Sequence, residues 1–355
     1  MKNLKKIIPL LMVALLFTNC SKINLRKDEN NSVIIFNNSY QTSANEADNI
    51  DSPTFYKLDS NNAWLISTAK STNRLLVHNA SNGDFIKYIG SKGSGQLEFL
   101  RPNGIFVIDS FLVVVERDNH RLQVITLPNL NFVAFIGTDE LVKPYGIFAY
   151  KKENQYHFYI TDNYETAEGQ IPPNNELNKR VLHYQFSYVE SIPTTKLIKK
   201  FGEIEGNGVL KIVESIWGDK ENNNLLIAEE KEDETCVKVY DFDGNFKNQI
   251  IGKGLFKYQV EGIAFYNAKY GKGFWIITDQ NLGDNTFHIF SRKDFNHIGS
   301  FKVSDTENTD GIWLTQNSFN NFPKGAFFSV NNDQNVSAVN LAVILKKFLT
   351  EEIEK

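Results

Sequence analysis

Three copies of a short sequence pattern place a carboxylate directly before a small residue and an apolar run. They are Glu214 in KIVESIWG (211–218), Glu261 in QVEGIAFY (259–266) and Asp310 in NTDGIWLT (308–315). A single acid of this kind often only marks a turn, since Asp-Gly is a favoured turn dipeptide. Several carboxylates that face one another repel unless a cation lies between them, and hard oxygen ligands in that number suit Ca²⁺. The pattern therefore predicts a calcium site, provided that the three segments meet.

Internal repetition supplies a fold in which these acids meet. Further copies of the pattern are RPNGIFVI (101–108), KPYGIFAY (143–150) and, more weakly, DSPTFYKL (51–58). Most copies recur roughly every 40 to 50 residues, and each is followed by short apolar strands separated by turn residues. Four short antiparallel strands repeated six times predict an all-β protein, a six-bladed β-propeller of four-stranded antiparallel blades.

The first strand of each propeller blade lines the central channel, so the residue before each glycine or serine lies at one mouth of that channel. These residues are Asp51 or Ser52, Asn103, Tyr145, Glu214, Glu261 and Asp310. The ends of the second strands lie close by and contribute Lys70, Arg117, Asp162, Glu229, Glu230 and Asp279. We therefore expect a mouth that carries several acids beside a few cations.

Most of the repeat region resembles the β-propeller phytases, 3-phytase-like calcium-dependent secreted phosphatases that act on myo-inositol hexakisphosphate. The segments that carry the likeness are VESIWGDKENNNLLIAEE (213–230), VEGIAFYNAKYGKGFWI (260–276), FHIFSRKDFNHIGSFKVSDTENTDGI (287–312) and FPKGAFFSVNN (322–332), with LISTAKSTNRLLVHN (65–79) and YGIFAY (145–150) before them. The likeness is strong in the second half of the chain and weak in the first.

The resemblance implies a phosphomonoesterase that releases phosphate from inositol hexakisphosphate, with lower inositol phosphates as the other products and a metal-activated water as nucleophile. The calcium- and water-binding carboxylates carried over from the family are Glu214, Glu230, Glu261 and Asp310, and the catalytic roles fall to Glu214, Glu230 and Asp310. The groups that match binders of substrate phosphate are Lys70, Arg117 and Tyr145. Cations at these places would stabilise the phosphate charge.

The chain departs from the family pattern among the metal ligands. Gln259 stands where the family has an aspartate two residues before the glutamate of VEGI, and its amide can coordinate calcium but brings no charge. Of the paired acids that precede proline in the first blade, only Asp51 is present, beside Ser52. Fewer ligand charges should weaken calcium binding.

A further departure affects the phosphate-binding groups of the third blade. The lysine of the family falls on Asn163, and a long insertion, NYETAEGQIPPNNELNK, begins there. Lys179 and Arg180 lie at the far end of the insertion, and our hypothesis is that they restore the positive charge. Solvated surface positions are the alternative for both residues.

A second class of function stays open. Residues 91–125 are similar to an NHL repeat, and NHL propellers commonly bind proteins or RNA without chemistry. A non-catalytic binding propeller or a calcium-dependent lactonase-type hydrolase is therefore the alternative to the phosphatase. Bound Ca²⁺ flanked by Lys70 and Arg117 would favour the phosphatase, whereas acids that point apart would favour the alternative.

The two ends of the chain differ from the repeats. Residues 1–20 combine a basic start, an apolar run and Cys20, which predicts a lipoprotein signal with lipidation at that cysteine. Residues 21–50 read as a polar tether, 51–345 as the propeller and 346–355 as a helical tail. We expect an exported bacterial lipoprotein of the outer membrane, periplasm or cell surface, monomeric and attached to the membrane through the lipid alone.

Composition and net charge limit the classes of molecule that the protein is expected to bind. The chain is 41% hydrophobic and 13% aromatic, too rich in apolar residues for disorder. Loss of Lys2, Lys5 and Lys6 with the signal leaves 35 basic and 42 acidic residues, a net charge of −7. Such a surface offers no general attraction for nucleic acid. The phytase resemblance implies a phosphorylated small molecule as the partner. Cys236, within the strand-like segment CVKVYDF, reads as an inert core thiol.

Overall fold

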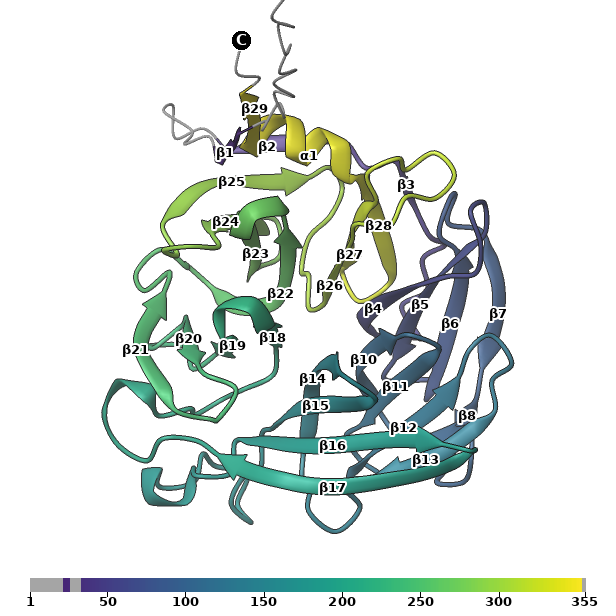
Figure 1. Cartoon of the computed structure of the whole chain (residues 1–355), viewed down its shortest axis with the longest axis vertical. Helices are drawn as coiled ribbons and strands as arrows, with labels where there is room; N and C mark the ends of the chain where they lie inside the picture. Colours follow the sequence, from purple (N-terminus) through teal and green to yellow (C-terminus); the bar gives the residue numbers. More distant parts are fainter. Residues whose placement is uncertain (1–21, 26–32, 353–355) are drawn as a thin grey trace, which may run out of the picture.

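Six β-sheets stand around a common axis in the computed structural model, which describes residues 22–25 and 33–352 (Figure 1). Each sheet is one blade, and its main strands follow sequence order from the axis to the rim. Neighbouring strands of the chain are antiparallel within each blade. This arrangement confirms the predicted six-bladed β-propeller.

The first three blades are built from consecutive strands. Blade 1 contains β4 (Ile50–Lys57), β5 (Ala63–Ala69), β6 (Arg74–Asn79) and β7 (Phe85–Ile89). Blade 2 contains β10 (Pro102–Ile108), β11 (Phe111–Glu116), β12 (Arg121–Thr126) and β13 (Phe132–Ile136). Blade 3 contains β14 (Pro144–Lys152), β15 (Gln155–Asp162), β16 (Val181–Val189) and β17 (Ile192–Phe201).

The last three blades follow the same plan and are completed from the N-terminal side. Blade 4 contains β18 (Ile216–Asp219), β19 (Asn224–Glu229), β20 (Cys236–Tyr240) and β21 (Phe246–Ile251). Blade 5 contains β22 (Gln259–Asn267), β23 (Gly273–Gln280), β24 (Thr286–Ser291), β25 (His297–Val303) and β2 (Ile34–Phe36). Blade 6 contains β26 (Ile312–Thr315), β27 (Ala326–Asn331), β28 (Asn335–Asn340) and β3 (Tyr40–Gln41).

Short elements lie between blades and between the strands of single blades. A parallel pair, β8 (Ser91–Lys92) and β9 (Glu98–Phe99), leads from blade 1 to blade 2. The 3-10 helices are η1 (Asn174–Glu176), η2 (Gly206–Gly208), η3 (Lys220–Asn222) and η4 (Lys269–Gly271). The insertion predicted in blade 3 contains η1 and joins β15 to β16.

Burial explains why the strands of one blade differ in composition. The second strands β11 (FLVVVE) and β19 (NLLIAE) are buried along their whole length, because neighbouring blades cover both faces. Such strands read as continuous apolar runs. The outer strands β17 and β21 expose most of their residues and are accordingly polar. The free thiol of Cys236 is buried at the start of β20, and burial raises its pKa to about 11, as expected for an inert core cysteine.

Aromatic rings close the channel below its mouth. Phe106, Trp217 and Trp313 lie three residues after the mouth positions of their own first strands. Their ring centroids are 5.0 to 5.4 Å apart, with tilted or edge-on planes. Such contacts add to area burial. The three rings thus pack across the channel, and a small cavity of about 50 Å³ remains beside Trp217 and Trp313.

The expected polar tether over residues 21–50 is wrong for its second half. Strand β2 pairs in parallel with β25 of blade 5, and β3 pairs with β28 of blade 6. The segment also buries Thr42, Asp48 and Ile50. Polar composition misled the prediction, because the strands are short and their partners come from the far end of the chain.

The C-terminal segment also differs from its predicted bounds. Helix α1 (Leu341–Phe348) begins where the side chain of Asn340 accepts a hydrogen bond from the backbone N–H of Ala342, and it packs Ile344 and Phe348 against blades 5 and 6. Residues Leu349–Glu352 form strand β29, which pairs with β1 (Lys22–Leu25). The helical tail predicted for 346–355 is therefore a helix only up to Phe348, and 353–355 lie outside the described residues.

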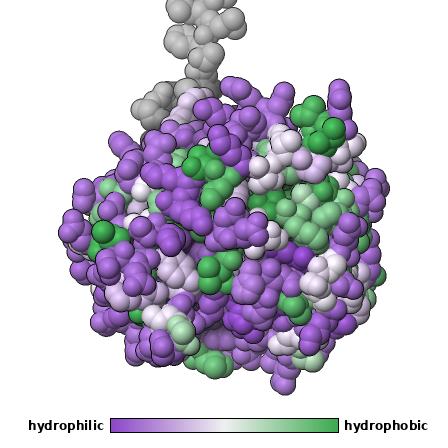
Figure 2. Space-filling view, turned by 90° about the horizontal axis from the view of Figure 1, so that it is seen from below, coloured by the Kyte–Doolittle hydropathy of each residue, from purple (hydrophilic) through white to green (hydrophobic). Residues whose placement is uncertain are grey.

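The predicted signal and Cys20 also lie outside the described residues. Within the part that the structure describes, helices are too short or too polar to cross a bilayer. The side of the molecule in Figure 2 is predominantly hydrophilic, with apolar residues in small separate groups. That side therefore lacks the broad apolar surface typical of stable protein interfaces.

Asp48 offers a test of the revised N-terminal boundary. Its buried carboxylate accepts hydrogen bonds from Arg74, Thr72 and Asn45. Asp48→Ala should lower the free energy of unfolding by about 2 to 3 kcal/mol, somewhat less than for a fully buried pair because Arg74 is partly exposed. Urea unfolding measures this loss. Glu46→Ala, at an exposed neighbour, is the control, and equal effects of the two variants would restore the tether interpretation.

Candidate functional site

In blades 1, 2, 3 and 5 the mouth residues sit in β-bulges at the start of the first strands, whereas Glu214 and Asp310 lie two residues before β18 and β26. The pairing register shifts between Pro102 and Ile105, and equivalent shifts occur in blades 1, 3 and 5. A bulge breaks the ladder and re-aims side chains. It explains how Asn103 and its equivalents turn toward the axis at the end of an otherwise regular strand.

In four of the six blades a glycine follows the mouth residue and allows adjacent blades to approach closely. A Cβ on Gly104 would overlap the carbonyl of Tyr145, and one on Gly146 would overlap the carbonyl of Glu214. Gly311 meets the carbonyl of Asp51 in the same way and closes the ring. Only glycine permits such contact of one backbone with the next. The residue before each glycine is therefore held at a fixed distance from its neighbour in the next blade.

The ends of the second strands divide into two sets with different roles. Side chains of consecutive strand residues point to opposite faces of a sheet. Asp162, Glu229 and Asp279 each accept two backbone N–H groups from the loop that precedes their own blade. These three predicted mouth residues are therefore structural. The residues one position later, Lys70, Arg117, Asn163, Glu230 and Gln280, are those on the mouth side.

Three glutamates form the centre of the site. Glu214, Glu230 and Glu261 each offer a carboxylate oxygen, and these atoms lie within 4.8 Å of one another. Glu230 and Glu261 are only 6% and 5% exposed. Gln259 donates a hydrogen bond to Glu230 Oε2 at 3.3 Å, while Glu230 Oε1 is buried without a hydrogen-bond partner among the described residues. An unsatisfied buried carboxylate oxygen beside two other carboxylates suits a divalent cation.

Lys70 joins two further acids to this centre. Its ammonium lies 2.9 Å from Asp51 Oδ1 and 2.8 Å from Asp310 Oδ2. Burial alone would lower the pKa of Lys70, but the two carboxylates outweigh it and raise that pKa. Ser52 donates a hydrogen bond to Asp51 at 2.8 Å. The structure therefore brings the predicted metal-binding acids Asp51, Glu214, Glu230, Glu261 and Asp310 to the same mouth, with the predicted lysine between two of them.

Two residues at this mouth were not predicted. Gln280 donates a hydrogen bond to Asp310 Oδ1. Asp333 accepts a hydrogen bond from Asn49 at 3.2 Å, and its other carboxylate oxygen is buried without a partner among the described residues. Alignment of the second strands one residue later would have identified Gln280. Asp333 follows the segment FPKGAFFSVNN, in the turn between β27 and β28, and was not among the strand-end positions compared between the repeats.

The electrostatic environment raises the pKa of the clustered acids. Burial, followed by repulsion from Asp51 and Asp310, raises the pKa of Glu214 to about 8. Burial and neighbouring glutamates raise the pKa of Glu230 and Glu261 well above the usual range. Burial also raises the pKa of Asp310 to about 7, although Lys70 opposes this shift. The full negative charge of the cluster therefore needs a cation to be stable at neutral pH.

Basic and phenolic groups lie on the opposite side of the mouth. Arg117 donates a hydrogen bond to the Tyr145 hydroxyl at 3.3 Å and pairs with Asp118 at 2.6 Å. Burial, then the nearby charge of Glu214, raises the pKa of Tyr145 to about 12, so its hydroxyl remains a hydrogen-bond donor. Tyr145 thus lies between the acidic cluster and Arg117.

The residues predicted to restore charge after the insertion do not do so. Arg180 is 1% exposed, and its guanidinium donates to backbone carbonyls of Asp162, Tyr164, Leu210 and Lys211. The prediction of a phosphate-binding Arg180 is wrong, because these bonds use its donors to hold the insertion against blade 4. Lys179 is exposed, and no hydrogen bond or ion pair among the described residues links it to the mouth.

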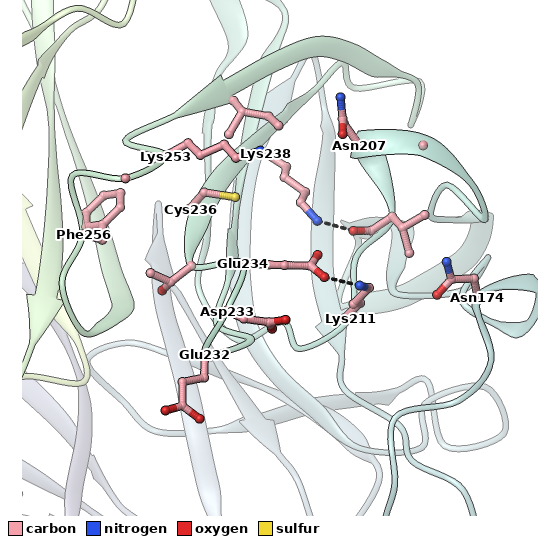
Figure 3. Close-up of a pocket in the computed structure, with 15 residues that line it drawn as sticks. Asn174, Asn207, Lys211, Glu232, Asp233, Glu234, Cys236, Lys238, Lys253 and Phe256 are labelled. Atoms are coloured by element: carbon pink, nitrogen blue, oxygen red, sulfur yellow. Dashed lines mark hydrogen bonds and ion pairs between the residues drawn. The ribbon is translucent and has the colours of Figure 1, made fainter.

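The acids of the mouth surround a narrow cavity. A small cavity of about 30 Å³ lies between Asp51, Tyr145, Glu214, Glu261 and Asp310. It has room for an ion or a water, so a larger ligand would rest above it. A cavity of about 580 Å³ lies beside blade 4 (Figure 3), but Lys211 there pairs with Glu234, and Lys238 donates to the Val209 carbonyl. Those two lysines are already neutralised or bonded within the protein.

Comparisons with known protein families match two successive regions of the chain. Residues 199–348 match the Phytase family, and residues 54–213 match a family described as a 6-bladed beta-propeller. The Phytase match includes Glu214, Glu230, Glu261 and Asp310 and confirms the resemblance for the second half of the chain. Curated protein sequences gave no match.

Solved structures support the fold alone. Regucalcin, a calcium-binding protein from Agrobacterium tumefaciens strain C58, aligns with a TM-score of 0.52 and 10% identity over 91% of this chain and 98% of that chain. A chain of the nidogen/laminin complex aligns with a TM-score of 0.52 and 12% identity over 80% of this chain and 91% of that chain. A member of the duf4221 family from Bacteroides vulgatus ATCC 8482 aligns with a TM-score of 0.50 and 9% identity over 94% of this chain and 99% of that chain.

The raised pKa values predict how stability depends on pH in the absence of divalent ions. A carboxyl with a higher pKa in the folded state binds its proton more tightly there, so its stabilising effect is full below the unfolded value of 4.5. It is lost as pH rises toward the folded value of about 8. With a chelator, the melting temperature should therefore fall between pH 5 and pH 8 (roughly the interval between the two values), and added Ca²⁺ should reverse the fall. A fall that Ca²⁺ leaves unchanged would contradict a shared metal site.

Two adjacent glutamates should respond in opposite directions. Glu229 is buried and pairs with buried Lys238 at 2.9 Å, so Glu229→Gln leaves that lysine unpaired and should cost about 3 kcal/mol or more. Glu230→Gln removes repulsion and should stabilise the calcium-free protein at pH 8. Urea unfolding in chelator measures both changes. Destabilisation by both substitutions would mean that Glu230 is also a structural residue.

Proposed function

We propose that the protein is a calcium-dependent phosphomonoesterase that hydrolyses inositol phosphates, with myo-inositol hexakisphosphate as the first substrate to test. The convergence of Glu214, Glu230 and Glu261 within 4.8 Å carries the proposal. Three carboxylates at this separation match the oxygen ligands that calcium takes in proteins. The Phytase match over residues 199–348 supports the same reaction class.

The distribution of charge around the mouth supports a phosphorylated substrate. Acids from blades 4 to 6 and from Asp51 lie on one side, while Arg117 and Tyr145 of blades 2 and 3 lie on the other. Bound calcium would neutralise phosphate oxygens and lower the pKa of a water. Arg117 and Tyr145 can donate hydrogen bonds to a second part of the substrate and orient it.

Lys70 has a connecting role in this proposal. It holds Asp51 and Asp310 in place through two ion pairs, and it supplies positive charge at the edge of the acidic cluster. Its contacts are with carboxylates in the absence of substrate, so a phosphate would share the ammonium with them. The roles of Lys70 are therefore to position the metal-binding acids and to attract the substrate.

The substitutions within the ligand set imply a weaker calcium site. Gln259 contributes a neutral amide beside Glu230, and its oxygen reaches the cluster only when the amide is turned over. Asn163 is 7% exposed and accepts a hydrogen bond from the backbone of Val213, so it adds no charge in blade 3. We therefore expect activity to require more calcium than a site with a full set of acids would need.

Phosphate release tests the proposal directly. The purified full chain is incubated with myo-inositol hexakisphosphate, with Ca²⁺ or with chelator, and free phosphate is measured. We expect release only with Ca²⁺, and Glu214→Ala and Asp310→Ala should each reduce the rate about 100-fold or more, because metal stabilisation of the transition state is worth several kcal/mol.

Asp84→Ala is the matched control for these variants. Asp84 is an exposed acid in the turn between β6 and β7, at the end of blade 1 away from the mouth. Its substitution should leave the rate unchanged. A folded wild-type protein that releases no phosphate in either condition would refute the phosphatase, and hydrolysis of a lactone under the same conditions would support the alternative hydrolase.

A further inference from the structure

Arg101 is a cation at the mouth that no family likeness or prediction identified. It directly precedes β10, two residues before the mouth residue Asn103. Its side chain makes no hydrogen bond or ion pair within the described residues, and its Nε is buried. Buried donors of this kind are rare without a partner. The guanidinium is therefore available to a ligand or to ordered water.

The backbone at this position does not favour arginine. Arg101 has φ +48°, in the left-handed region. The equivalent residues two positions before Asp51 and Asp310 are Asn49 and Asn308, with φ +50° and +45°. Asparagine tolerates this conformation several-fold better than most residues. Blade 2 therefore carries an arginine where the same local geometry in two other blades carries asparagine, and the side chain must be explained by something other than the backbone.

The surroundings of Arg101 are positive and partly unsatisfied. Its carbonyl accepts the backbone N–H of Arg117 at 3.1 Å, so the two arginines are direct cross-strand neighbours. Arg117 is bonded to the Tyr145 hydroxyl. Asn103 is 1% exposed, and neither its amide oxygen nor its amide nitrogen has a partner among the described residues. Asp118 pairs with Arg117, so the groups left without a partner among the described residues are the Arg101 guanidinium and the Asn103 amide, and an anion or a bridging water would satisfy them.

We infer that Arg101 is a substrate-positioning residue, which with Arg117 binds a phosphate group of the substrate on the blade 2 side of the mouth. The inference rests on the proposed phosphatase function and adds a residue to it. Guanidinium groups bind phosphate through paired hydrogen bonds, and two of them with the Tyr145 hydroxyl give a set of donors on one side of the anion. Asn103 completes the site through a buried water.

Arg101→Asn separates a binding role from a structural role. The variant places in blade 2 the residue that blades 1 and 6 use, so its melting temperature should be equal to or higher than that of the wild type. The KM for inositol hexakisphosphate should rise about ten-fold or more, because a hydrogen bond to a charged group is worth about 1.5 to 3 kcal/mol. The value of kcat should change much less, and Arg101→Lys should recover part of the affinity.

A second readout makes the result independent of catalysis. Calorimetry measures the Kd of inorganic phosphate and, separately, of Ca²⁺ for the full chain. Arg101→Asn should weaken phosphate binding about ten-fold and leave Ca²⁺ binding unchanged. Lys196→Gln removes one charge from exposed β17 and is the control. If the wild type is inactive yet binds phosphate through Arg101, only the proposed reaction fails.

The remaining outcomes overturn the inference. An active enzyme in which Arg101→Asn and Lys196→Gln have the same KM and the same phosphate Kd would show that Arg101 does not touch the substrate. A lower melting temperature of Arg101→Asn with unchanged phosphate Kd would assign it a structural role. If both variants weakened phosphate binding equally, the effect of Arg101 would be that of general positive charge alone.

Discussion

Contact between the backbones of adjacent blades is the constraint on which the site depends. Each glycine of the mouth lies against the carbonyl of the next mouth residue, as Gly146 does against Glu214 and Gly311 against Asp51. At the four glycine positions no side chain fits in between, so the first strands of these blades are held close to their neighbours. Acids that would repel one another in a flexible loop are thereby held together. The free energy that this arrangement costs is offset by the packing of the blades, not by interactions within the site.

That constraint turns carboxylates into a potential metal centre. Burial and mutual repulsion raise the pKa of Glu214, Glu230 and Glu261, so the cluster holds protons when no cation is present. A divalent cation competes with those protons, which links metal binding to pH. Lys70 forms ion pairs with Asp51 and Asp310 and offsets part of their charge beside the glutamates. The mouth thus combines a strongly acidic centre with cations at its border.

Sequence repetition was sufficient to predict the blades and most of the site, because propeller geometry relates equivalent positions of every repeat. Glu214, Glu261 and Asp310 meet as predicted. The errors occur where repetition gives no guidance. Asp279 and Gln280 are neighbours on one strand, and only the direction of each side chain shows that the acid binds backbone while the amide faces the mouth. Arg180 was misplaced because its partners are main-chain carbonyls, which sequence does not reveal.

Closure of blade 6 has a consequence for biosynthesis. Strand β3 leaves the ribosome among the first structured residues, but its partner β28 is made almost at the end of the chain. Early blades can form as they are translated, whereas the ring itself stays open until translation is nearly complete. A product that stops before residue 335 would leave an unpaired strand at each side of the gap and would be prone to association with other chains. Closure of the ring therefore depends on β28, which the chain supplies only after the first five blades.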